Sequence, residues 1–130
     1  MTFSKRALVA ALMTVAVAVT LPVLLAASGE KVKQVSPEFV CMVNKKHYNS
    51  PQIAVNVDGR TYYACCDPCV KQLQENPASR TAVDPVSGKT VDKATSAVGI
   101  DKDGNVYFFE NPENLRKFRG TAKEANTATP

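Results

Sequence analysis

Four cysteines carry the chemistry that this sequence can do. Cys41 precedes an alternating apolar segment, and three more follow that segment within five positions: Cys65, Cys66 and Cys69. Thiolates are soft ligands that bind Zn(II) and Cu(I), and in an oxidising compartment thiols also pair as disulfides. His47 is the single histidine of the chain. This excludes most sites built from several histidines and leaves no basis for a Ser-His-Asp set, so we expect a non-catalytic protein.

A β-hairpin is the first element needed to gather these cysteines. Residues 53–57 alternate along a strand, the Asp-Gly pair at 58–59 is a two-residue turn signal, and residues 61–63 are rich in strand formers. A hairpin returns the chain to its starting end. Cys41 and Cys65 should therefore lie close together in space.

A helix is the second element. Asp67 is expected as its N-cap with Pro68 at the first helical position, and the Asn-Pro pair at 76–77 ends it. Cys69 then lies one helical turn beyond Cys65, which is the layout of a small treble-clef-like metal knuckle. The positive end of the helix should lower the pKa of the Cys69 thiol and favour the thiolate that binds metal.

The same signals recur about 45 residues later. The Asn-Pro pair at 111–112 lies 44 residues after Asp67-Pro68, so the start of the second helix is expected to slip by one position. The matching residues are Val98 and Ile100 for the first strand, Asp103-Gly104 for the turn, Tyr107 and Phe108 for the second strand, and Leu115 and Phe118 for the helix.

These halves predict an α+β fold of two small ββα, treble-clef-like units, residues 38–80 and 81–120, packed as one domain. A unit of about 40 residues usually needs a metal, a disulfide or a partner to be stable. The second half has no cysteine and holds Ser87, Glu110 and Asn114 near the corresponding positions. We therefore expect it to pack on the first half, and its expected contribution to a shared core is Phe108, Phe109, Leu115 and Phe118. The alternative is two unrelated hairpin-helix units.

Residues 1–28 have the form of an export signal or a membrane anchor. Lys5 and Arg6 precede an apolar run over residues 7–27, and small residues at its end offer a cleavage site. The run is also long enough to span a bilayer. We expect the rest of the chain in a periplasm, free after cleavage or anchored to the inner membrane by residues 7–27. Residues 121–130 are expected to be a disordered tail.

The composition is that of one globular domain, with 130 residues, 45% hydrophobic and 22% charged. The formal net charge is +4, of which Lys5 and Arg6 supply two positive charges in the N-terminal segment. The remaining balance is too weak to indicate a nucleic-acid partner.

Three cysteines and an aromatic run carry a family resemblance. Cys41, the run Tyr62-Tyr63-Ala64-Cys65 and Cys69 lie in a segment, residues 39–80, that resembles the TRASH and YHS domains. These are related cysteine-containing modules associated with heavy-metal sensing, trafficking and resistance. The resemblance implies Cys41, Cys65 and Cys69 as metal ligands and leaves Cys66 as an added thiol.

The second half is similar to a YHS domain as well. Residues 84–88, Asp-Pro-Val-Ser-Gly, are similar to the opening motif of that family with serine in place of the usual cysteine. The aromatic run at 107–109 is similar to its second strand. This copy has lost the ligands that the family would place there.

The identity of the metal stays open between copper and zinc. Zinc prefers four ligands, and all four thiolates could supply them. Neighbouring strand residues point to opposite faces, so Cys65 and Cys66 would converge only if the strand has already broken into a turn there. Three soft thiolates suit Cu(I), and the Met42 thioether is a possible additional ligand. His47 is expected to be a solvated loop residue, with a role as a ligand as the alternative.

We therefore predict an exported metal-homeostasis protein that binds Cu(I) or Zn(II) for delivery, buffering or resistance. Its partner would be another periplasmic or membrane metal-handling protein. One alternative is a disulfide-stabilised extracytoplasmic interaction module. Another is a thiol-disulfide oxidoreductase, which is less favoured because three residues, rather than two, separate Cys65 from Cys69.

Overall fold

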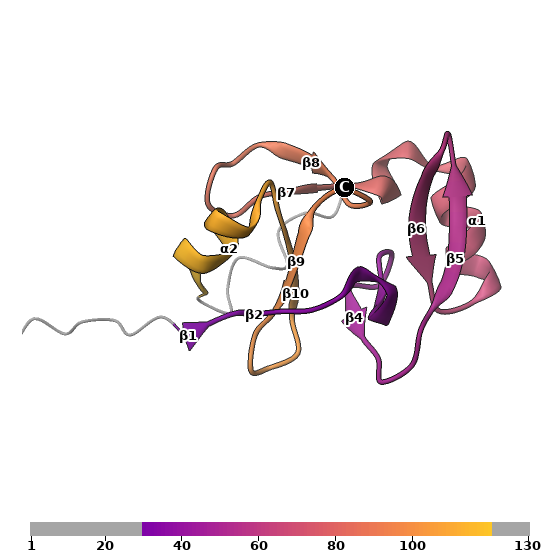
Figure 1. The fold of residues 1–130 in the computed structure, drawn as a ribbon. Helices are drawn as coiled ribbons and strands as arrows, with labels where there is room; N and C mark the ends of the chain where they lie inside the picture. Colours follow the sequence, from indigo (N-terminus) through magenta and orange to yellow (C-terminus); the bar gives the residue numbers. More distant parts are fainter. Residues whose placement is uncertain (1–29, 121–130) are drawn as a thin grey trace, which may run out of the picture.

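Two successive segments of the chain fold in the same order, each giving a short hairpin, a longer hairpin and a helix. The computed structural model describes residues 30–120 and is an α+β fold of small antiparallel sheets and two helices (Figure 1). The expected signal or anchor in residues 1–28 and the expected tail in residues 121–130 lie outside the described residues. Within residues 30–120, no helix has the length and apolar character needed to cross a membrane.

Unit 1, residues 40–75, contains the cysteines. Its longer hairpin turns through Asp58 and Gly59, whose φ angles of 52° and 76° are those of a two-residue turn, as predicted. Val55 and Tyr62 are paired in this hairpin and are both buried. The elements are β3 (Val40–Cys41) paired with β4 (Lys46–His47), β5 (Ile53–Val57) paired with β6 (Arg60–Ala64), and α1 (Asp67–Glu75).

Unit 2, residues 81–117, repeats this order with a longer loop in its second hairpin. Ile100 pairs with Val106, so residues 101–105 form the loop, and the predicted two-residue turn at 103–104 is wrong. The Asp101 carboxylate causes the difference, because it accepts hydrogen bonds from two backbone N–H groups of the loop. The elements are β7 (Thr81–Val83) paired with β8 (Thr90–Asp92), β9 (Ala97–Ile100) paired with β10 (Val106–Phe109), and α2 (Pro112–Lys117).

The short hairpins β3–β4 and β7–β8 are additions to the predicted ββα units. Strands of two or three residues are too short to show an alternating pattern. The segment before unit 1 also joins the fold, since it borders both β9 and the end of the described chain. It forms β1 (Glu30–Lys31) paired with β11 (Arg119–Gly120), and β2 (Lys33–Gln34) paired with β9; the 3₁₀ helices are η1 (Pro37–Phe39) and η2 (Pro77–Arg80).

One hydrophobic cluster joins the two units. In this cluster Phe108 of β10 packs with residues of unit 1, so the prediction of a shared core is confirmed for Phe108. Phe109 lies on the other face of β10, because successive side chains of a strand point to opposite faces. There it packs with Val32 and α2, and this second cluster also takes the other residues expected in the shared core, Leu115 and Phe118. The shared cluster consists of Val40, Met42, Val55, Tyr62, Ala64, Leu73, Val98, Val106 and Phe108.

Both helices begin at equivalent residues. Cys66 is the N-cap of α1 and Asn111 is the N-cap of α2, and both have extended backbones, with φ of −161° and −157°. The predicted N-cap at Asp67 is wrong, because Asp67 is already the first residue of the helix. The two caps lie 45 residues apart, so the predicted slip of one position disappears.

Polar side chains of β8 and its turn tie unit 2 to unit 1. Asp92 accepts hydrogen bonds from Arg60 and from the Tyr62 hydroxyl, both on β6. Lys93 is 3% exposed, and its Nζ donates to the carbonyl oxygens of Met42 at 2.7 Å and Ser79 at 2.8 Å. Its ammonium also lies 5.4 Å from the centroid of the Phe108 ring. Lys93 therefore fixes the turn after Cys41 against unit 2.

We expect Lys93→Ala to lower the free energy of unfolding by about 2 kcal/mol, because two carbonyl oxygens lose a charged donor and a buried side chain is removed. Chemical denaturation followed by circular dichroism measures this difference. Lys71→Ala removes an exposed lysine of α1 and should change the free energy by less than about 0.5 kcal/mol. Equal effects of the two substitutions would contradict the role given to Lys93.

Candidate metal centre

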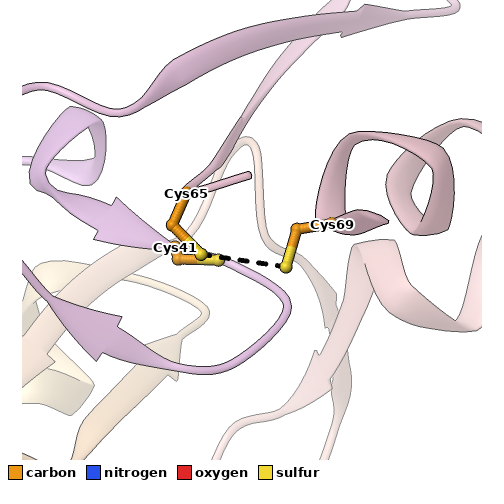
Figure 2. A group of neighbouring side chains, drawn as sticks. All are labelled: Cys41, Cys65 and Cys69. Carbon is orange, nitrogen blue, oxygen red and sulfur yellow. Dashed lines mark hydrogen bonds between the residues drawn. The ribbon is translucent and has the colours of Figure 1, made fainter. Parts of the chain in front are cut away.

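The structure brings Cys41, Cys65 and Cys69 together from three different elements. Cys41 ends β3, Cys65 follows the last residue of β6, and Cys69 lies in the first turn of α1. Their side chains are directed at one another (Figure 2). We call these three residues the thiol triad. Cys41 is fully buried, and the other two are half-buried.

The sulfur atoms of the thiol triad lie within 4.8 Å of one another. The separation between the Sγ atoms of Cys65 and Cys69 is 3.8 Å. Zn–S bonds of about 2.3 Å in a tetrahedral site place two sulfurs about 3.8 Å apart, and three-coordinate sites need slightly more. The Cys65–Cys69 separation therefore equals that of two thiolates on one metal ion, and the separations that involve Cys41 are no longer than 4.8 Å.

Cys66 lies beside the thiol triad on its exposed side. Its Sγ is 3.7 Å from the Sγ of Cys65 and 3.4 Å from that of Cys69. Cys65 and Cys66 converge because β6 has already ended at Ala64, so the condition predicted from the sequence for their convergence is met. Cys66 is nevertheless not one of the three residues whose sulfurs all lie within 4.8 Å. All four cysteines are free thiols in the structure.

The pKa values of Cys65 and Cys69 move in opposite directions. Burial acts to raise the pKa of Cys65, but hydrogen bonds with Cys41, Tyr48, Cys66 and Cys69 outweigh it and lower that pKa. Burial raises the pKa of Cys69, and the neighbouring thiols raise it further. The expectation of a lowered pKa at Cys69 is therefore wrong for the metal-free thiols. Of these two thiols, Cys65 therefore loses its proton more readily than Cys69.

Asn44 and Tyr48 are polar neighbours of Cys65 that the sequence did not reveal. The Asn44 side-chain amide donates to the Cys65 sulfur at 3.3 Å and to the Tyr48 hydroxyl oxygen at 3.1 Å. Asn44 is held by the tight turn after Cys41, where its side-chain oxygen accepts from the N–H of Lys46. The spacing from Cys41 could have suggested a turn residue, but not its contact with a sulfur 21 positions away.

Met42 and His47, the possible additional ligands, have other contacts. Met42 is fully buried and its side chain belongs to the shared hydrophobic cluster. His47 lies in β4, where it is half-buried and its ring centroid is 6.4 Å from that of Phe39. It is not part of the group of close ligand atoms found among the described residues.

Asp84 takes the place of Cys41 in unit 2. The Cys41 carbonyl accepts from the N–H of Lys45, which has a φ of 54°, and the Asp84 carbonyl accepts from that of Gly88, with a φ of 70°. The strand pairing next to each turn matches as well, since Val83 pairs with Thr90 in unit 2 as Val40 pairs with His47, 43 residues earlier, in unit 1. The expected counterpart near Ser87 is thus replaced by Asp84.

In unit 2, the Asp84 carboxylate occupies the position that corresponds to the sulfur cluster of unit 1. One carboxylate oxygen accepts from the N–H of Glu110 at 2.7 Å and from the Asn114 amide at 2.8 Å. These two residues lie 45 positions after Cys65 and Cys69. The other oxygen accepts from the N–H groups of Val86 and Ser87. Asp84 is fully buried, so unit 2 uses a hydrogen-bonded carboxylate where unit 1 offers thiols.

The sequence also contains a Cys-X-X-Cys motif, which involves Cys66 instead of Cys65. Cys66 and Cys69 are separated by two residues, in the order Cys-Asp-Pro-Cys at the start of α1. This two-residue spacing is visible in the sequence and is the one typical of redox-active dithiols.

Comparison of the chain with models of known protein families gives no match, and comparisons with curated proteins and with solved structures give none either. The resemblance to the TRASH and YHS domains therefore stays a prediction. The thiol triad stands on the geometry alone.

We expect Asp84→Ala to lower the free energy of unfolding by about 3 kcal/mol, because three N–H groups and the Asn114 amide lose a charged acceptor. Denaturation at pH 7 measures this loss. Asp103→Ala removes an exposed carboxylate of the 101–105 loop and should change the free energy by less than about 0.5 kcal/mol.

Stability should also depend on pH through Asp84. Burial acts to raise its pKa, but the hydrogen bonds from Asn114, Glu110, Val86 and Ser87 outweigh it and hold the pKa below its usual value. The folded protein then binds this proton less readily than the unfolded chain. The contribution of Asp84 is therefore complete above about pH 4 and is lost as the pH falls through the lower, folded-state pKa. Thermal melts of wild type and Asp84→Asn between pH 7 and pH 2 test this, and the wild type should lose more stability on acidification.

Proposed function

We infer that this protein binds a soft metal ion through Cys41, Cys65 and Cys69, and that its function is delivery or buffering rather than catalysis. One observation carries the proposal: three sulfur atoms from three separate elements lie within 4.8 Å of one another. Apolar side chains would fill this space better than thiols, so packing does not explain the convergence. Thiolates at this spacing are ligands for Zn(II) and Cu(I).

The arrangement around the thiol triad supports a treble-clef-like unit. A short hairpin supplies Cys41, a longer hairpin ends at Cys65, and a helix begins before Cys69. A metal ion would join these three segments in a unit too small to be stable by its own core. Unit 2 supports the same reading, since Asp84 joins the equivalent segments there by hydrogen bonds. On this basis we retain the relation to the TRASH and YHS domains as part of the proposal.

Copper is the first candidate and zinc the second. Three thiolates satisfy Cu(I), whereas Zn(II) prefers a fourth ligand, for which the exposed Cys66 is the nearest thiol. An exposed thiol beside the centre would also accept an ion from a partner protein or pass one to it. The apolar run at residues 7–27 supports a place for this exchange outside the cytoplasm, in a periplasm.

The test is a metal titration of the full chain, purified anaerobically with reduced thiols, against chromogenic chelators for Cu(I) and for Zn(II). We expect one ion per chain. Cys69→Ser should weaken binding by at least about 100-fold, because even the loss of a residue that only supports a ligand costs about 10- to 100-fold. Ser87→Ala, in the cysteine-free unit, is the matched control and should leave the affinity unchanged.

Cys66→Ser separates the two metals. A three-thiolate copper centre should keep its Cu(I) affinity within a few-fold, whereas a four-thiolate zinc centre should lose Zn(II) affinity as strongly as in Cys69→Ser. Unchanged affinity for both metals in Cys69→Ser would falsify the proposed centre.

A further inference from the structure

Cys66 and Cys69 are arranged as a dithiol at the start of α1. Two residues separate them, and their sulfur atoms are 3.4 Å apart, compared with 3.7 Å for Cys65–Cys66 and 3.8 Å for Cys65–Cys69. A disulfide bond is about 2.05 Å long, so the two atoms need to approach by about 1.35 Å, or about two-fifths of their separation. Cys66 is exposed and Cys69 is half-buried.

We propose that Cys66 and Cys69 form a redox-active dithiol whose oxidation to a disulfide removes Cys69 from the metal centre. The exposed thiol would meet an incoming disulfide, and the half-buried thiol would complete the exchange. The link to the metal rests on the proposed function, but the dithiol itself does not.

The reaction is an exchange with a disulfide RSSR, such as oxidised glutathione. The Cys66 thiolate attacks one sulfur of RSSR, the S–S bond breaks, and RS⁻ leaves. The Cys69 thiolate then attacks the Cys66 sulfur, forming the Cys66–Cys69 bond and releasing a second RS⁻. The protons lost by the two cysteines pass to the two RS⁻ groups. The protein is oxidised by two electrons, and one RSSR is reduced to two RSH.

Burial and backbone geometry favour a disulfide between Cys66 and Cys69 over the other possible cysteine pairs. Cys41 is fully buried, so an external disulfide cannot reach its sulfur in the folded protein. Cys65 and Cys66 are adjacent in sequence, and a bond between neighbours would strain the extended backbone at Cys66. Cys65 and Cys69 are both half-buried and their sulfurs are 3.8 Å apart, whereas Cys66 is exposed, lies three positions before Cys69 and has its sulfur at 3.4 Å.

The consequence for the metal follows from the ligand count. A sulfur in a disulfide no longer offers the thiolate that a metal ion needs. Oxidation would therefore leave Cys41 and Cys65 as the remaining members of the thiol triad. The loss of Cys69 as a ligand should weaken binding by at least about 100-fold, as in Cys69→Ser, so the centre would release its ion to a competing ligand under oxidising conditions and bind it again after reduction.

The first experiment uses the metal-free full chain in buffers with a stepwise ratio of oxidised to reduced glutathione. Mass spectrometry after alkylation counts the hydrogens lost to disulfides. We expect wild type and Cys65→Ser to lose two hydrogens at similar ratios, and Cys66→Ser to need at least about a tenfold higher ratio. The dithiol is overturned if Cys66→Ser oxidises as readily as the wild type, or if Cys65→Ser does not oxidise.

The second experiment repeats the series with Cu(I)-loaded chains and a chromogenic Cu(I) chelator. We expect the wild type to release one equivalent of copper as the disulfide forms, and Cys66→Ser, which keeps all three members of the thiol triad, to keep its copper over the same range. Disulfide formation with copper retained would overturn the link to the metal. Failure to bind either Zn(II) or Cu(I) under reducing conditions would count against the proposed function itself, while the metal-free series would still decide whether the dithiol exists.

Discussion

Each unit depends on a polar centre at the point where its short hairpin, its longer hairpin and its helix meet. Segments this short bury too little apolar surface to hold their ends together without such a centre. Unit 1 places three thiols there, and unit 2 places the Asp84 carboxylate, with hydrogen bonds to Glu110 and Asn114. The two polar centres are geometrically equivalent, because each connects the end of the second strand of the longer hairpin to the first turn of the helix.

The division of work between the units follows from this difference. A carboxylate that accepts four hydrogen bonds closes the centre of unit 2 with no added ion. Unit 2 also buries both faces of β10, one against α2 and the other against unit 1. It can therefore serve as a scaffold for unit 1. Under the proposed function, the thiols would then be free to exchange a metal without loss of the whole fold.

The sequence revealed the features that depend on local patterns. The hairpin through Asp58-Gly59 and the approach of Cys41 to Cys65 follow from alternation and turn chemistry, and the structure has both. The sequence did not reveal features that depend on side chains reaching across the fold. Asp84 could not be recognised as the counterpart of Cys41, because the equivalence lies in a backbone turn and not in residue type. The effect of burial on Cys69 likewise required knowledge of its neighbours.

Lys93 gives unit 2 an influence on the charge of a centre to which it supplies no ligand. Its ammonium is held against the Met42 carbonyl, one residue from Cys41, and burial lowers its pKa to about 8, so the side chain remains mostly cationic at neutral pH. Three thiolates with a monovalent ion carry two net negative charges, and with a divalent ion they carry one. A fixed buried cation offsets part of either excess. It thereby reduces the electrostatic repulsion between several thiolates in a small volume, and this stabilising charge comes from unit 2.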